Sequence, residues 1–135
     1  MQLRSICKSK IHHAIVTEAN LEYIGSIGID KDLMERANIL PGEKVGIWNI
    51  NNGERIETYA LPAPAGSGDI IINGAAARRF REQDKIIIVA FVLTDEPISP
   101  SMILVNRNNQ FVDWLGDNRM PDPLEMDLAA PASEP

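Results

Sequence analysis

The sequence predicts a mainly β fold, a small closed β-barrel, on three observations. Short runs rich in β-branched residues recur along the chain between turns, whereas only two short stretches resemble helix. The longest run, residues 84–94, is almost continuously apolar and predicts a central core strand. Asn52-Gly53 separates two other runs and is a strong hairpin signal, because this pair adopts positive φ easily. Short strands of this kind can bury their apolar faces by closing into a barrel.

The individual elements are predicted from local patterns. Strands are expected over residues 2–7, 10–17, 20–29, 44–50, 55–61, 70–72, 84–94, 102–105 and 111–115. A short helix, 31–38, should begin at the N-cap Asp30 and stop before Pro41-Gly42. Its apolar face should carry Leu33, Met34 and Ala37. Residues 62–68 are predicted as a loop, and the turn at Asn73-Gly74 should enter a helical turn over 75–79.

Composition limits the class of protein. A length of 135 residues with 44% hydrophobic and 24% charged residues is typical of one globular domain. The net charge of −6 argues against nucleic acid or an anionic membrane as partner. The first ten residues lack the long apolar stretch of a signal peptide, and the longest apolar run is too short to cross a bilayer. The single Cys7 fits a reducing compartment, so we expect a cytoplasmic protein.

The two ends of the chain differ in composition. Residues 1–116 carry the predicted barrel, whereas residues 117–135 are acidic and contain four prolines. Such a composition predicts a flexible tail that is not part of the folded domain. No His, Cys, Asp or Glu cluster has metal-ligand spacing, so we expect no metal.

Gly25-Ser26 is the most informative dipeptide, because it lies between two apolar, β-rich flanks. A serine hydroxyl adjacent to a glycine carbonyl can attack that carbonyl if the backbone is held in a suitable geometry. Gly25 itself should allow this, since a glycine can take conformations closed to other residues and permits close approach. The same dipeptide also occurs in ordinary turns, and neighbouring motifs are needed to decide.

Five motifs occur in a fixed order around this dipeptide: Lys10-Ile11-His12, Thr17-Glu18-Ala19-Asn20-Leu21, Tyr23-x-Gly25-Ser26-x-x-Ile29-Asp30, Asn52-Gly53-x-Arg55-x-x-Thr58-Tyr59 and Asn73-Gly74-Ala75-Ala76-Ala77. Together they resemble the pyruvoyl-dependent L-aspartate 1-decarboxylase family, from about residue 3 to about residue 94. The resemblance implies a six-stranded double-psi β-barrel and a homotetramer with sites between protomers. It also implies cleavage at Gly25-Ser26 and conversion of L-aspartate to β-alanine for pantothenate synthesis.

The resemblance assigns roles at the cleavage site. Ser26 would become a pyruvoyl group, whose ketone condenses with the substrate amine and accepts the electrons left by decarboxylation. No pyridoxal phosphate is then needed, and no phosphate-cradling loop is visible. Thr58 would hydrogen-bond the Gly25 carbonyl during cleavage. Tyr59 would return a proton to Cα, because a phenol is protonated at neutral pH. Whether cleavage needs a maturation partner is left open.

Further residues are expected to bind the substrate. Arg55 and Lys10 would hold the two carboxylates of aspartate, with the planar Arg55 fork matching one of them. The backbone of the segment Asn73, Gly74, Ala75 and Ala76 would contact the substrate as well. His12 and Tyr23 are expected to line the pocket, and Trp48 to pack beside it.

These roles raise a geometric difficulty on the strand 55–61. In a regular strand Arg55 and Tyr59 share one face, while Thr58 lies on the other. Both roles are compatible only if the strand is bulged or the site lies between protomers. The family arrangement favours the site between protomers.

Two other functions are compatible with parts of this sequence. An unprocessed barrel that binds a ligand or partner would need none of the cleavage residues. A hydrolase with Ser26 as nucleophile needs an oriented base, for which His12 is the candidate, and no triad motif is visible. Two positions depart from the family pattern: Gly28 predicts a looser strand and slower processing, and His13 replaces a common arginine.

Overall fold

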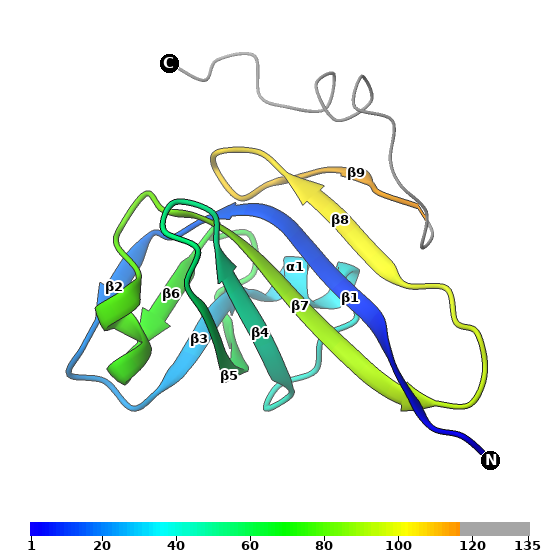
Figure 1. Ribbon diagram of the computed structural model, residues 1–135. Helices are drawn as coiled ribbons and strands as arrows, with labels where there is room; N and C mark the ends of the chain where they lie inside the picture. The colour runs from blue at the N-terminus through cyan, green and yellow to red at the C-terminus, as the bar shows by residue number, and fades with distance from the viewer. Residues whose placement is uncertain (117–135) are drawn as a thin grey trace.

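The computed structural model describes residues 1–116 and confirms a mainly β fold (Figure 1). The predicted tail, 117–135, lies outside the described residues. The strands are β1 (Arg4–Ile15), β2 (Glu18–Asn20), β3 (Ser26–Asp30), β4 (Lys44–Asn49), β5 (Arg55–Ala63), β6 (Ile70–Asn73), β7 (Lys85–Thr94), β8 (Ser101–Val105) and β9 (Phe111–Trp114). The helices are α1 (Lys31–Arg36) and the 3₁₀ helix η1 (Gly74–Arg79).

The strands form a ring because β1, which pairs with β7, runs directly into β2, which pairs with β6 at the other end of the strand order. They are hydrogen-bonded in the order β2-β6-β3-β5-β4-β7-β1-β8-β9. Only Val16 and Thr17 separate β1 from β2, and the Thr17 amide donates to the Ile70 carbonyl at 2.9 Å. If β1 and β2 are counted as one continuous strand, it closes a ring with β6, β3, β5, β4 and β7. The ring then has six members, as the resemblance implies. The parallel pairs β2–β6 and β3–β5 distinguish it from a simple up-and-down barrel.

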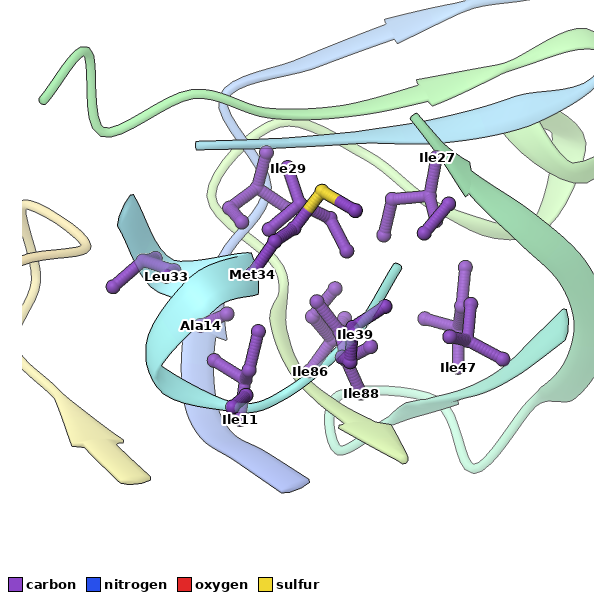
Figure 2. Close-up of a cluster of buried hydrophobic side chains, with 14 of the residues drawn as sticks. Ile11, Ala14, Ile27, Ile29, Leu33, Met34, Ile39, Ile47, Ile86 and Ile88 are labelled. Atoms are coloured by element: carbon purple, nitrogen blue, oxygen red, sulfur yellow. The ribbon is translucent and has the colours of Figure 1, made fainter. Parts of the chain in front are cut away.

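The core is a cluster of branched aliphatic side chains inside this ring (Figure 2). β7 pairs with both β1 and β4, as expected for a central strand. Its Ile86 and Ile88 are fully buried and lie near Ile47 of β4 in Figure 2. Burial of one such side chain contributes about 1.5–3 kcal/mol, so the barrel provides a rigid frame for residues on its outer face.

Helix α1 begins as predicted but ends early. The Asp30 carboxylate accepts the Asp32 amide at 2.9 Å and also the amides of Gly66 and Gly68, so it fixes α1 and the loop beside it. Leu33, Met34 and Ala37 are buried, as expected. The helix stops at Arg36 rather than at the predicted residue 38, because Asn38 adopts a positive φ of 58°.

The first two predicted strands are one strand. β1 runs from Arg4 to Ile15 with irregularities at Cys7/Ser9 and His12/Ala14. His13 has a φ of 67° at the second of these, and the bulge there lets the strand continue past it.

The predicted strand 20–29 is wrong, because the chain turns within it. β2 ends at Asn20 and β3 starts at Ser26. The Asn20 side chain accepts the Glu22 amide at 3.1 Å, which forms a local turn that competes with a strand. The exposed segment 21–25, which we call the cleavage bend, therefore leads directly into Ser26.

The remaining predictions hold with small shifts in their bounds. Gly53 has a φ of +77° in the β4–β5 hairpin, and Asn109 has a φ of 57° between β8 and β9. β5 extends through Pro62, which was predicted as loop. Proline is tolerated there because the pairing of β5 with β4 has already ended at Tyr59.

Candidate active site

Ser26 is held at the start of β3 by its partner on β6. The register sets Ser26 opposite Asn73, and the Asn73 Nδ2 donates to the Ser26 Oγ at 3.2 Å. Ile27 and Ile29 face the core, so the side chain of Ser26 lies on the other face of β3. Ser26 is only 2% exposed. Its hydroxyl is thus shielded and oriented by a neutral amide.

The prediction that Gly25 adopts a backbone conformation closed to other residues is wrong. The glycine with a positive φ at the cleavage site is Gly74. Gly25 is not among the residues with positive φ, and a Cβ built on it would meet nothing within 4 Å. Gly74 has a φ of +74°, and a Cβ on it would lie 2.7 Å from the Gly25 Cα. The backbone of Gly74 therefore packs directly on the backbone of Gly25.

Thr58 and Tyr59 approach the cleavage site from β5. The parallel β3–β5 pairing sets Ile27 opposite Ala60, and continuing it backwards would set Tyr59 beside Ser26 and Thr58 beside Gly25. The β4–β5 register is continuous over these residues, which excludes a bulge there. Thr58 is half-buried, and Tyr59 is 38% exposed. The strand is therefore not bulged at these residues, and a site between protomers stays a prediction.

Arg55 lines a hollow of about 290 Å³ on the outer face of the barrel. Its walls include Gly46, Trp48, Arg55, Glu57 and Phe91. The Arg55 guanidinium stacks on the Trp48 ring at 4.3 Å, and no ion pair within residues 1–116 uses Arg55. We call this region the cationic hollow.

Lys10 and His12 reach the same face from β1. Lys10 pairs with Val89, which lines the hollow, and His12 pairs with Ile87, which in turn pairs with Trp48. Rows of paired residues thus run across β1, β7, β4 and β5 and bring the predicted substrate-binding cations to one face.

Within one chain the cationic hollow and Ser26 are separate places. Arg55 lies four residues from Tyr59 on β5, which corresponds to about 13 Å at the rise of an extended strand. The chain brings Gly25, Ser26, Asn73 and Gly74 into contact, whereas Arg55 and Lys10 are placed by the rows on the outer face.

Comparison with known proteins decides what this arrangement belongs to. The family model for aspartate decarboxylase matches residues 1–112. The aspartate 1-decarboxylase of Thermoanaerobacter pseudethanolicus is 54% identical over 114 residues, 82% of this chain and 97% of the relative. That of Carboxydothermus hydrogenoformans is 50% identical over 112 residues, 80% and 88% of the two chains. That of Bacillus cereus strain B4264 is 47% identical over 117 residues, 84% and 92%.

The chain belongs to the aspartate decarboxylase family. The resemblance is confirmed, and the match continues beyond residue 94, where it was expected to end. The family match thus also covers β8 and the start of β9, which lie on the far side of β1 from the cationic hollow.

The remaining predicted residues of this family member lie around the cleavage bend. Tyr23 is 66% exposed, and its carbonyl lies near Gly74. Ala75 is exposed and Ala76 half-buried in η1. Gly28 does not break β3, because its pairing with β5 and β6 is continuous.

His12 is unsuited to act as a proton carrier at neutral pH. Burial, with smaller contributions from His13, Lys10 and Lys85, lowers its pKa from 6.5 to about 3. Its Nδ1 is buried without a hydrogen-bond partner among the described residues, and its ring stacks on His13 at 3.8 Å. His12 is therefore neutral in the decarboxylase barrel and contributes shape rather than charge.

Sequence reasoning missed Gly46, which shapes the cationic hollow. A Cβ at Gly46 would lie 3.2 Å from the Val89 Cγ1 and 3.4 Å from the Trp48 Nε1. A lone glycine inside a strand often marks such a close approach, and this was the available signal.

No group of three or more His, Cys, Asp or Glu residues within residues 1–116 could hold a metal ion. The same residues form no helix that is long and apolar enough to span a membrane.

Proposed function

We propose that this chain cleaves its own Gly25–Ser26 bond and then converts L-aspartate to β-alanine and CO₂ for pantothenate synthesis. The observation that carries the proposal is the arrangement at Ser26. A buried hydroxyl is oriented by Asn73, and the adjoining glycine is held by Gly74. These contacts fit a pyruvoyl precursor, because they hold the nucleophile and the scissile backbone together before cleavage.

Cleavage begins as Ser26 Oγ attacks the Gly25 carbonyl carbon. The C–N bond breaks, the hydroxyl proton passes to the nitrogen, and an ester forms, with Thr58 donating to the Gly25 carbonyl oxygen. Loss of the Ser26 Cα proton then breaks the Cβ–O bond and frees the Gly25 carboxylate. The dehydroalanine left behind takes up water and releases ammonia, which leaves the pyruvoyl group. The net charge changes from −6 to −7, because one carboxylate and no amine is gained.

The mature site would divide its work among residues of the chain. The pyruvoyl group supplies the electron-accepting carbonyl that decarboxylation at Cα requires. Arg55 binds one carboxylate through two parallel N–H donors, and Lys10 attracts the other. Tyr59 donates a proton to Cα after CO₂ leaves. Beside Ser26, the substrate would contact the backbone of the segment Asn73, Gly74, Ala75 and Ala76.

Substrate binding is proposed to need a second copy of the chain. Arg55 lies about 13 Å along the β5 backbone from the residue beside Ser26, and we propose that the arginine of a second copy binds the substrate at Ser26. Phe91 and Leu93 of β7 and Leu61 of β5 are exposed apolar residues that a second copy would cover. We propose a homotetramer in the cytoplasm, where the free thiol of Cys7 stays reduced.

Neither alternative function is supported equally well. A hydrolase would need a base near Ser26, but Ser26 is paired with Asn73 and His12 lies on β1, which is not adjacent to β3. An unprocessed binding barrel would not need Gly74 to pack on Gly25.

The domain boundary near residue 116 is proposed as well, with 117–135 as an acidic tail outside the catalytic unit.

The test is the intact mass of purified protein under denaturing conditions, followed by trapping. We expect two fragments, residues 1–25 and a chain starting at the modified position 26 that resists N-terminal sequencing. Borohydride with aspartate should add the mass of the amine product to the larger fragment. A single chain of 14.9 kDa that persists on warming, and also after exposure to host extract, would contradict the proposal. Cleavage only with the extract would point to a maturation partner.

A further inference from the structure

We propose that Gly74, rather than Gly25, is the glycine that self-cleavage requires, and that it acts as a positioning residue for this reaction. The inference rests on the proposed function, since it concerns cleavage at Gly25–Ser26. It assigns to Gly74 a role before any substrate binds, in addition to the substrate contact proposed above.

The contact between the two glycines is made by backbone atoms. Gly74 is buried, and a Cβ there would lie 2.7 Å from the Gly25 Cα, 2.8 Å from the Gly25 nitrogen and 3.1 Å from the Tyr23 carbonyl oxygen. Real Cβ atoms essentially never come within 3.0 Å of such atoms. Backbone cannot swing aside as a flexible side chain can. Any side chain at position 74 therefore displaces the cleavage bend from β6.

One dipeptide holds both reacting groups. Asn73 donates to the Ser26 Oγ at 3.2 Å, and the next residue, Gly74, packs against Gly25, whose carbonyl carbon is the target. Asn73 stands at the N-cap of η1 but makes no capping hydrogen bond with its side chain. The separation of nucleophile and electrophile is thus set by Asn73-Gly74, and a shift of about 1 Å in such a separation can cost about 100-fold in rate.

Gly25 has no comparable constraint. It lies in the exposed cleavage bend, and a Cβ on it would meet nothing within 4 Å. Its φ is outside the left-handed region that disfavours other residues. An alanine at position 25 should therefore fit the same backbone.

The experiment compares three glycine-to-alanine variants of the full chain. Each is purified as precursor, and loss of the 14.9 kDa species is followed by mass spectrometry. Gly74→Ala should slow cleavage by about 100-fold. Gly25→Ala changes the scissile residue itself but meets no steric conflict, so it should cleave about tenfold faster than Gly74→Ala. The matched control is Gly53→Ala, since Gly53 has a φ of +77° but nothing within 4 Å, and it should cleave normally.

Hydroxylamine then identifies the step that Gly74 controls. It attacks an ester, giving a hydroxamate at Gly25 and a free amine at Ser26. Fragment masses distinguish this cut from hydroxylamine scission at Asn52-Gly53 and Asn73-Gly74. Because Gly74 acts before ester formation, folded Gly74→Ala precursor should resist this cut. Cleavage of Gly74→Ala near the normal rate, or its scission by hydroxylamine between residues 25 and 26, would overturn the proposal. Failure of Gly25→Ala to cleave would also overturn the proposal, even if Gly74→Ala does not fold. If the unsubstituted chain does not cleave, the proposed function itself fails.

Discussion

The cleavage site and the cationic hollow differ in burial and in charge. At the cleavage site the buried Ser26 hydroxyl meets a neutral amide, and the backbone of Gly74 packs on that of Gly25. In the cationic hollow Arg55 is exposed, and its guanidinium stacks on Trp48. The difference suggests a division of labour: one region makes the electrophile within a single chain, and the other recognises an anionic substrate that comes from solution.

The largest expected effect is at the cleavage site. Ser26→Ala removes the nucleophile, so cleavage and decarboxylation should both be abolished while the fold persists. The intact mass would stay that of one chain, and no β-alanine would form. Ser9→Ala is the matched control, because Ser9 is also a buried, hydrogen-bonded serine. Cleavage of the Ser26→Ala chain between residues 25 and 26 would contradict the account.

The next effect separates the two regions. Arg55→Ala should leave cleavage unchanged and lower kcat/KM for aspartate by about 100-fold, as expected for loss of a charged hydrogen-bond pair. Arg36→Ala is the control, because Arg36 stacks on Phe111 at 4.1 Å just as Arg55 stacks on Trp48. Steady-state kinetics and intact mass on the same preparations measure both quantities. Loss of cleavage in Arg55→Ala would show that the regions are not separate.

A smaller effect tests the shape of the hollow. Gly46→Ala places a Cβ against Val89 and Trp48, so the stacked Arg55 should shift. We expect KM for aspartate to rise by about fivefold, which corresponds to about 1 kcal/mol of overpacking, with normal cleavage. An unchanged KM would mean that Trp48 does not position Arg55 for substrate.

The smallest effect concerns His12 and pH. Its folded pKa of about 3 lies below the unfolded value of 6.5, so between these values the unfolded chain binds more protons. The stability that His12 contributes is therefore fully present above pH 6.5 and is lost as pH falls toward 3. His12→Asn should reduce the fall of Tm over this window relative to the original chain. Equal slopes in the two proteins would argue against a buried neutral imidazole.

Much of the fold could be predicted because local signals and tertiary pairing agree. Asn52-Gly53 marks a hairpin by its conformational preference alone, and Asp30 caps α1 as its side chain allows. The break between Asn20 and Ser26 was missed because Tyr23 and Ile24 resemble strand residues although they are exposed. Apolar composition does not reveal whether a side chain finds the core.

The site was predictable as a set of residues but not as an arrangement. Ordered motifs identified Ser26, Thr58, Tyr59 and Arg55, and the family is confirmed. The contact of Gly74 with Gly25 depends on pairing between β3 and β6, which lie more than forty residues apart, as the Ser26–Asn73 hydrogen bond also shows. Local reasoning therefore assigned the conformational role to the wrong glycine.

The most direct test of the division of labour is complementation between two inactive chains. Ser26→Ala keeps the cationic hollow, and Arg55→Ala keeps the cleavage site. They would be co-expressed with different tags, and assemblies containing both would be isolated and assayed for β-alanine formation. If a site uses Ser26 from one protomer and Arg55 from another, mixed assemblies should regain activity above either parent. Mixed assemblies as inactive as their parents would show that both regions must belong to one chain.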